Sequence, residues 1–336
     1  MERHASTPTH PNPGLKPLLR DSNFALLAAS RFLSSAAILM QSVAIGWQVY
    51  AQTGKVVYLG YVGLAQFLPF FVFILWSGMV ADRHDRRRIL IVCNATYFIG
   101  SLSLLAFTLT GIHSLIPVFL ILALLGTSRA FAMPASQAML RNVVDDSQLG
   151  RAIPIATGVF HVAVVAGPML GGFLYLYGPV VTHATISALL LLATLMLTLV
   201  RTRQKREPPA PLTWNDTLKG FAFVWSKPIL KGALSLDLFA VIFGGATAML
   251  PALAQDILQT NAAGLGLLRA APALGATFMS LLLIRFPLHR KVGMWMFSGV
   301  GVFGIATIGL GLSHQLWLSL AALHNNIALS VDSALT

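Results

Sequence analysis

The chain has 336 residues, of which 56% are hydrophobic and only 10% are charged. A soluble domain carries about 25% charged residues, so this composition excludes an ordinary soluble domain and indicates a chain embedded in lipid. The formal charge of +12 does not indicate nucleic acid as a partner, because the basic residues lie in short loops between apolar runs. We expect no cofactor, no metal and no enzyme activity, since the sequence contains no phosphate-binding loop, metal-ligand spacing or nucleophile constellation.

The first part of the chain predicts a polar cytoplasmic tail, residues 1–22, and an N-terminal half of six helices, residues 23–200. The tail contains four prolines and has no apolar core, so it is not a signal peptide. Each apolar run that follows is close to the roughly 20 residues that cross a bilayer as a helix. The predicted spans are residues 24–49, 56–80, 89–109, 115–139, 153–176 and 180–200.

The longest polar stretch, residues 201–227, predicts a basic cytoplasmic linker between two membrane halves. Within it, residues 214–225 are amphipathic enough to lie at the membrane interface as a short helix. Residues 228–336 predict an incomplete C-terminal half of about four helices. Its expected spans are residues 229–253, 264–284 and 292–312, with a weaker candidate at 316–335.

The distribution of basic residues predicts the orientation in the membrane. If the N-terminus is cytoplasmic, 19 of the 23 lysine and arginine residues fall in cytoplasmic segments, and only Lys55 falls in an outer turn. Cytoplasmic loops carry this excess of positive charge in membrane proteins. The single cysteine, Cys93, lies within an apolar run, so no intramolecular disulfide is expected.

An arginine-rich island separates the second and third predicted spans. A topology anchor would explain its arginines but not their spacing, which resembles the Gly-x-x-x-Asp-Arg-x-Gly-Arg-Arg-Arg loop between helices 2 and 3 of the major facilitator superfamily. Asp85 stands where the family has its second glycine; if a left-handed turn is needed there, Asp tolerates it better than most residues but less well than Gly. The residues that match this gating motif are Gly78, Asp82, Arg83, Arg86, Arg87 and Arg88.

This resemblance implies an all-α polytopic membrane protein with two pseudo-repeat halves, of which about 10 of the usual 12 transmembrane helices are present. It also implies a secondary transporter of a small molecule that is a monomer in the bacterial inner membrane. In such a transporter, we expect Asp82 to accept hydrogen bonds or to pair with a charge at the cytoplasmic face. No ATP-binding motif is present, so we expect an ion gradient, carried by protons, as the driving force.

A second motif lies in the fifth span, at Gly167, Pro168, Gly171 and Gly172. It resembles the family's Gly-x-x-x-Gly-Pro-x-x-Gly-Gly, which is associated with proton-coupled exporters, although Ala163 replaces the first glycine. Small residues at these spacings let helix backbones approach closely, and a proline permits bending. The alternative is ordinary small-residue packing with no role in export.

Four charged residues and one histidine in the predicted spans are candidates for proton or substrate contacts. A buried arginine costs several kcal/mol unless it is paired or hydrated, so we expect Arg129 to face a cavity. Arg31 and Arg269 could instead extend to the inner and outer interfaces, respectively. Asp237 could be a helix N-terminal charge, and His161 a hydrogen-bonded interior histidine.

Short matches spread along most of the chain, at residues 67–69, 129–131, 237 and 251–254, together resemble the bacterial branch that includes the enterobactin exporter and related drug-efflux proteins. We therefore expect proton-coupled efflux of a siderophore or amphipathic drug-like compound, with Asp237, Arg31 and Arg129 near the inner end of a central cavity. Two alternatives stay open. A protein with an incomplete second half could be inactive in transport, and the same architecture could serve an importer.

Overall fold

The computed structural model describes residues 21–111, 114–202, 225–226, 231–232, 235, 244–285 and 292–324. All regular elements in these ranges are helices, so the all-α prediction is confirmed. Most of the tail and of the linker, and about half of the seventh span, with Asp237, lie outside the described residues. The first six long helices are α2 (Ser22–Thr53), α3 (Val56–Arg83), α4 (Arg86–Thr110), α5 (Ile116–Met139), α6 (Asp146–Tyr175) and α7 (Pro179–Leu199).

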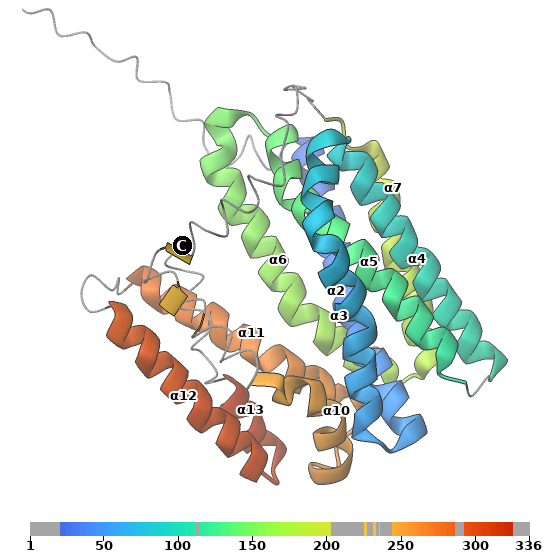
Figure 1. Cartoon of the computed structure of the whole chain (residues 1–336), viewed down its shortest axis with the longest axis vertical. Helices are drawn as coiled ribbons and strands as arrows, with labels where there is room; N and C mark the ends of the chain where they lie inside the picture. The colour runs from blue at the N-terminus through green and yellow to red at the C-terminus, as the bar shows by residue number, and fades with distance from the viewer. Residues whose placement is uncertain are drawn as a thin grey trace, which may run out of the picture.

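Helices α2 to α7 pack into one bundle, seen on the right of Figure 1. Helix α2 packs against α6 and α7, α3 packs against α5, and α4 packs against α5 and α7. Buried polar contacts add to this packing: the Ser30 hydroxyl on α2 donates to the Ala193 carbonyl on α7 at 2.7 Å. The bundle therefore holds together through contacts between helices that are distant in sequence.

The predicted loop between the second and third spans is mostly helical. Helix α3 continues to Arg83 and α4 begins at Arg86, so only His84 and Asp85 form the turn. Asp85 has φ −62°, and its carboxylate accepts the backbone N–H of Arg87 at 2.9 Å as the N-cap of α4. The expectation of a left-handed turn at Asp85 is thus wrong. Where the family has glycine, the Asp85 side chain caps the next helix from a backbone conformation that any residue can adopt. Gly78 lies inside α3 and does not end it.

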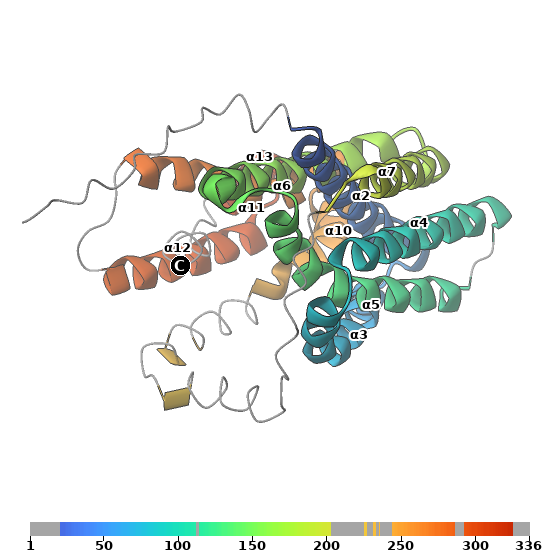
Figure 2. The ribbon, with the colours of Figure 1, turned by 90° about the horizontal axis from the view of Figure 1, so that it is seen from above.

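The second group of helices begins with three short elements, η2 (Gly244–Met249), α10 (Leu250–Ala252) and the π-helical η3 (Leu253–Ile257). Three longer elements follow, α11 (Ala262–Arg285), α12 (Val292–Leu312) and α13 (Leu316–His324). Helix α11 packs against α6 and against α13. Figure 2 shows the second group, in orange and red, beside the first bundle as seen from above. About ten of the family's twelve helices are accounted for by these elements and the first six.

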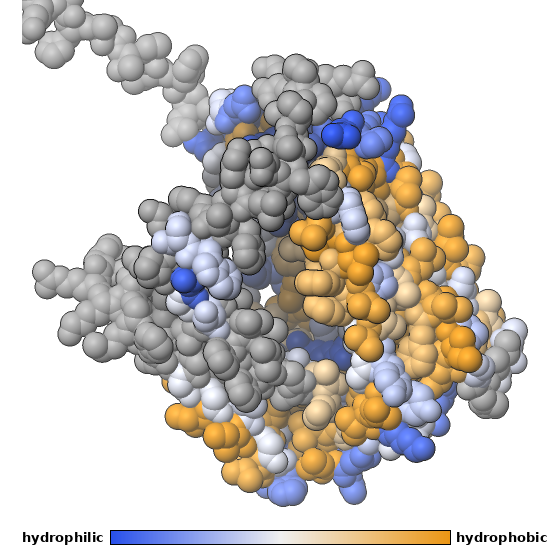
Figure 3. All heavy atoms as spheres, viewed as in Figure 1, coloured by the Kyte–Doolittle hydropathy of each residue, from blue (hydrophilic) through white to orange (hydrophobic). Residues whose placement is uncertain are grey.

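The outer surface of the first bundle is apolar. Among the described residues, seven helices are long and apolar enough to cross a membrane. Helix α3 exposes Phe67, Phe71 and Leu75, whose side chains are 57%, 62% and 63% exposed. Figure 3 shows the resulting hydrophobic surface, with hydrophilic residues gathered at the end that carries the α3–α4 turn. A face of this kind is stable in lipid and not in water, so the protein is an integral membrane protein.

We call the end of the first bundle that contains residues 83–88 the arginine end. The end with the α2–α3 turn at Gly54 and Lys55 is called the distal end. Helices α6 and α11 lie close together towards the distal end and separate towards the arginine end, as Figure 1 shows.

Candidate functional site

A cavity of about 360 Å³ is lined by α2, α4, α5 and α6 of the first bundle, with one residue each from α3 and α7. Its volume falls in the range of small-molecule sites, about 300 to 1,000 Å³. The wall combines aliphatic side chains with an unusual number of polar ones for the interior of a membrane bundle. The polar lining residues are Ser30, Arg31, Ser34, Ser35, Gln41, Ser42, Gln66, Asn94, Tyr97, Arg129 and Ser136. Polar groups at membrane depth are costly, so they mark substrate or ion pathways.

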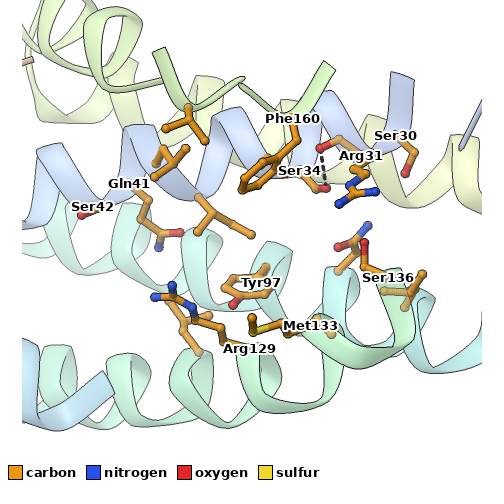
Figure 4. A pocket seen from close by; sticks show the side chains of 18 of the residues that line it. Ser30, Arg31, Ser34, Gln41, Ser42, Tyr97, Arg129, Met133, Ser136 and Phe160 are labelled. Carbon is orange, nitrogen blue, oxygen red and sulfur yellow. Dashed lines mark hydrogen bonds between the residues drawn. The ribbon is translucent and has the colours of Figure 1, made fainter. Parts of the chain in front are cut away.

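Arg31 enters the cavity from α2. Its guanidinium carbon lies 5.7 Å from the centre of the Phe160 ring, which α6 contributes to the same wall. Figure 4 shows the guanidinium directed into the cavity, towards the side where Ser136 lies. The structure therefore places Arg31 along the cavity and does not extend it to the interface.

Arg129 enters from the opposite side, on α5. Its guanidinium carbon lies 5.8 Å from the centre of the Phe70 ring of α3. Figure 4 shows it directed across the cavity towards Gln41 on α2. The Gln41 side chain lines the cavity, is 2% exposed, and its amide nitrogen has no hydrogen-bond partner among the described residues. Arg129 and Gln41 thus both present donors to the same space.

The glycines of the fifth span sit at helix crossings. A Cβ on Gly171 would lie 2.7 Å from the Met40 Cα, and one on Gly167 would lie 2.9 Å from the Ala36 carbonyl oxygen, both on α2. Gly172 faces α11, where a Cβ would collide with the Ala262 carbonyl. Glycine is needed at these positions because only a hydrogen fits between the backbones. The motif therefore joins α6 to α2 and to the second group of helices.

Arg269 on α11 also reaches the first bundle. Its guanidinium donates to the Ser42 hydroxyl of α2, so the expectation that it extends to the outer interface is wrong. The reason lies on α2: a Cβ at Gly46 would lie 3.0 Å from Arg269 Nη2, and glycine leaves the space that the guanidinium occupies. Arg269 therefore links the second group of helices to Ser42, a residue of the cavity wall.

Two further hydrogen bonds join the two groups of helices at the distal end. The Tyr50 hydroxyl of α2 donates to the Asp256 carboxylate of η3. The Gln255 amide, also on η3, donates to the Trp47 carbonyl of α2 at 3.4 Å. The distal end is thus bridged by polar contacts in addition to helix packing.

The arginines of the gating motif make a different set of contacts. Arg86 donates to the Asn142 side chain at 3.2 Å, and Arg87 donates to the carbonyls of Leu197, at 3.2 Å, and Thr198. These bonds tie α4 to the connection after α5 and to the end of α7. Within the described part of the chain, no hydrogen bond or ion pair reaches the exposed Asp82 carboxylate, so its predicted bonding stays a prediction.

Of the other predicted candidates, Asp237 lies outside the described residues. His161 is exposed, and its ring packs at 64° to Phe160, so it is not an interior histidine. Among the described residues, His183 of α7 is a buried histidine, and it bonds to the Gln48 side chain at 3.1 Å. His183 and Gln41 were not predicted from the sequence, because neither carries a formal charge that would distinguish it from the other small polar residues of an apolar run.

A bundle of membrane-spanning helices around a polar cavity, joined to a second group of helices towards one end, defines a polytopic membrane transport protein. A sequence model described as the Major Facilitator Superfamily matches residues 27–331. The chain therefore belongs to the major facilitator superfamily, which confirms the resemblance inferred from its motifs. The superfamily consists of transporters of small molecules.

Among curated proteins, the chain is 28% identical to the enterobactin exporter EntS of Shigella flexneri over 294 residues, 84% of this chain and 69% of the relative. It is 27% identical to EntS of Escherichia coli O139:H28 (strain E24377A / ETEC) over 294 residues, 84% of this chain and 70% of the relative.

Solved structures support the fold. The bacterial homologue of the human lysosomal transporter Spinster, in an inward-facing and unoccupied conformation, superposes with a TM-score of 0.68 at 16% identity, covering 94% of this chain and 75% of that one. A mutant of the nucleoside transporter NupG gives a TM-score of 0.63 at 15% identity, covering 93% and 81% of the respective chains.

Proposed function

We propose that the protein is a proton-coupled exporter of a siderophore or another amphipathic small molecule. The observation that carries the proposal is the polar cavity, lined by Arg31 and Arg129, inside an otherwise apolar bundle. Similarity to an enterobactin exporter supports export of a siderophore-like compound. A rigid-body movement of the two groups of helices around such a cavity would alternate its access to the two sides of the membrane.

The arginine end faces the cytoplasm in this proposal, and the protein is a monomer in the bacterial inner membrane. The charge bias of the loops supports this orientation. The described conformation, in which the distal end is bridged, is then closed towards the outside. An exporter loads its substrate from the cytoplasm in this state.

Proton coupling is assigned to Asp237, the only acidic residue well inside a predicted span. An isolated carboxylate at membrane depth is driven towards its protonated form by desolvation, and a nearby arginine favours the charged form. If Asp237 lies near Arg31 or Arg129 when the cavity faces one side, alternating access would change its protonation and couple proton entry to substrate exit.

Purified protein in liposomes tests the proposal. A pH gradient, acid inside, should drive accumulation of an amphipathic dye such as rhodamine 6G or carboxyfluorescein, and a protonophore should abolish it. Asp237→Asn should abolish gradient-driven accumulation, whereas Asp146→Asn, an exposed residue in the first turn of α6, should leave it unchanged.

If Asp237→Asn accumulates dye at the rate of the parent protein, with the same dependence on the pH gradient, the coupling role of Asp237 is refuted. Absence of any gradient-driven accumulation in the parent across both dyes would favour the inactive alternative. Accumulation driven only by the opposite gradient would favour an importer.

A further inference from the structure

The charges around the cavity are unbalanced. The chain contains 11 acidic residues, and the structure describes six of them. All six lie at the end of a helix or within one residue of it, namely Asp21, Asp82, Asp85, Asp145, Asp146 and Asp256. None of the six lines the cavity, whereas Arg31 and Arg129 both do.

The partners of these two arginines do not neutralise them. Each guanidinium lies near an aromatic ring, Phe160 or Phe70, and no described carboxylate is paired with either one. A guanidinium carries five N–H donors and no acceptor, so an aromatic face leaves most of its hydrogen-bonding capacity unused. A charged group at membrane depth needs a counter-charge or water.

Gln41 provides an independent indication of what the cavity accepts. Its side chain is buried in the wall, and its amide nitrogen donates to no described group. Figure 4 shows this amide facing Arg129 across the cavity. A buried donor without an acceptor is uncommon and costly, so a bound molecule that brings an acceptor would be favoured at this point.

We propose that the transported compound is an organic anion, with its negatively charged oxygens held by the guanidiniums of Arg31 and Arg129 and by the Gln41 amide. Its apolar or aromatic part would pack against Phe160, which is 38% exposed, and against the aliphatic wall. Charge-assisted hydrogen bonds from arginine to carboxylate-like groups are the strong ones in proteins, and arginine recognises them bidentately.

The same charges disfavour a cationic compound. Two positive side chains that face one cavity repel a third positive charge, and no described acid in the wall offsets that repulsion. The inference rests on the proposed transport function but names the substrate class separately, so binding and transport can be measured apart.

The test is a binding measurement with two xanthene dyes of opposite charge. Purified full-length protein in detergent is titrated into carboxyfluorescein, an anion, or rhodamine 6G, a cation, and binding is followed by fluorescence anisotropy. The parent should bind carboxyfluorescein at least roughly tenfold more tightly than rhodamine 6G. Arg31→Gln and Arg129→Gln should each weaken carboxyfluorescein binding by roughly tenfold or more without weakening rhodamine 6G binding.

Arg141→Gln is the matched control, because Arg141 is exposed on the 3₁₀ turn after α5 and does not line the cavity. It should bind both dyes as the parent does. Arg129→Lys should retain part of the preference for the anion, because it keeps the charge and loses the bidentate geometry. If a glutamine variant does not fold, the dye preference of the parent and of Arg129→Lys still decides the question.

Tighter binding of rhodamine 6G by the parent would overturn the proposal. So would an equal loss of carboxyfluorescein affinity in Arg141→Gln and Arg129→Gln. Selective anion binding without gradient-driven accumulation would leave the substrate class standing and refute the exporter function. Gradient-driven transport with no preference for the anion in binding would support the exporter function and refute the proposed substrate class.

Discussion

The two ends of the molecule are held together in different ways. At the arginine end, the described contacts of Arg86 and Arg87 stay within the first bundle, and the buried cluster there draws all its residues from α2 to α7 and their connections. At the distal end, α2 contacts the second group of helices through Tyr50, Arg269 and a shared apolar cluster around Val43.

This difference indicates which contacts must break for the protein to change state. Contacts within one bundle can persist while the bundle moves as a rigid body, whereas contacts between the two groups must separate when the distal end opens. Arg86 and Arg87 therefore stabilise the first bundle. The distal contacts hold the described conformation.

Gly172→Val is expected to destabilise the closed state of the distal end more than any other substitution proposed below. The new side chain would collide with the Ala262 backbone on α11, and backbone cannot move aside as a side chain can. Overpacking of this kind costs about 1–3 kcal/mol, which lowers the ratio of closed to open protein by about fivefold to 150-fold. Spin labels on cysteines at Lys55 and His314, both in distal turns, should report a longer distance by pulsed electron paramagnetic resonance.

Gly158→Val is the control for this substitution. Gly158 lies on the same helix, α6, and a Cβ there meets nothing within 4 Å. The intrinsic helix cost of valine is similar at both sites, so only the crossing contact differs. An unchanged distance in Gly172→Val, or an equal change in Gly158→Val, would contradict the role of this crossing.

A smaller shift is expected from Tyr50→Phe, which removes the hydroxyl that donates to Asp256. Hydrogen bonds to charged groups contribute about 1.5–3 kcal/mol, but the exposure of Asp256 reduces this, so we expect the open population to rise by about threefold to tenfold. The same pair of spin labels measures it. Tyr61→Phe, in a ring that is 49% exposed on α3, should change nothing; an equal effect of the two would argue against the bridge.

The smallest effects belong to the arginine end. Arg87→Gln should lower the thermal stability of the protein, by about 1 kcal/mol, because it loses its bonds to the end of α7. It should not change the distal distance. Arg88→Gln should have almost no effect on stability, since its side chain is 85% exposed and lies 3.8 Å from Asp85. A longer distal distance in Arg87→Gln would show that this arginine also links the two groups.

Much of the fold could be predicted from the sequence, because a span of apolar residues between charged turns can satisfy its backbone hydrogen bonds in lipid only as a helix or as part of a closed barrel. The ends of helices were less predictable. Hydropathy ends a span where charges begin, yet α4 starts at Arg86 because Asp85 caps it and because Arg86 and Arg87 donate to carbonyls on α5 and α7. Such partners are distant in sequence and cannot be located from it.

The site was predictable only where it carries charge. Arg31 and Arg129 are conspicuous within apolar runs, whereas Gln41 and Phe160 are not. The direction of Arg269 depends on the absence of a side chain at Gly46, on another helix. No local pattern around Arg269 contains that information.

The central claim is that the cavity opens towards the cytoplasm while the distal end is closed to the outside. Cys93→Ser removes the one cysteine of the chain, and Ser136→Cys then places a thiol in the cavity wall. A membrane-impermeant thiol reagent should label Ser136→Cys in inside-out vesicles and not in intact spheroplasts, with the opposite result for Lys55→Cys in the distal turn. Labelling of Ser136→Cys from the outside, at the rate seen for Lys55→Cys, would contradict the account.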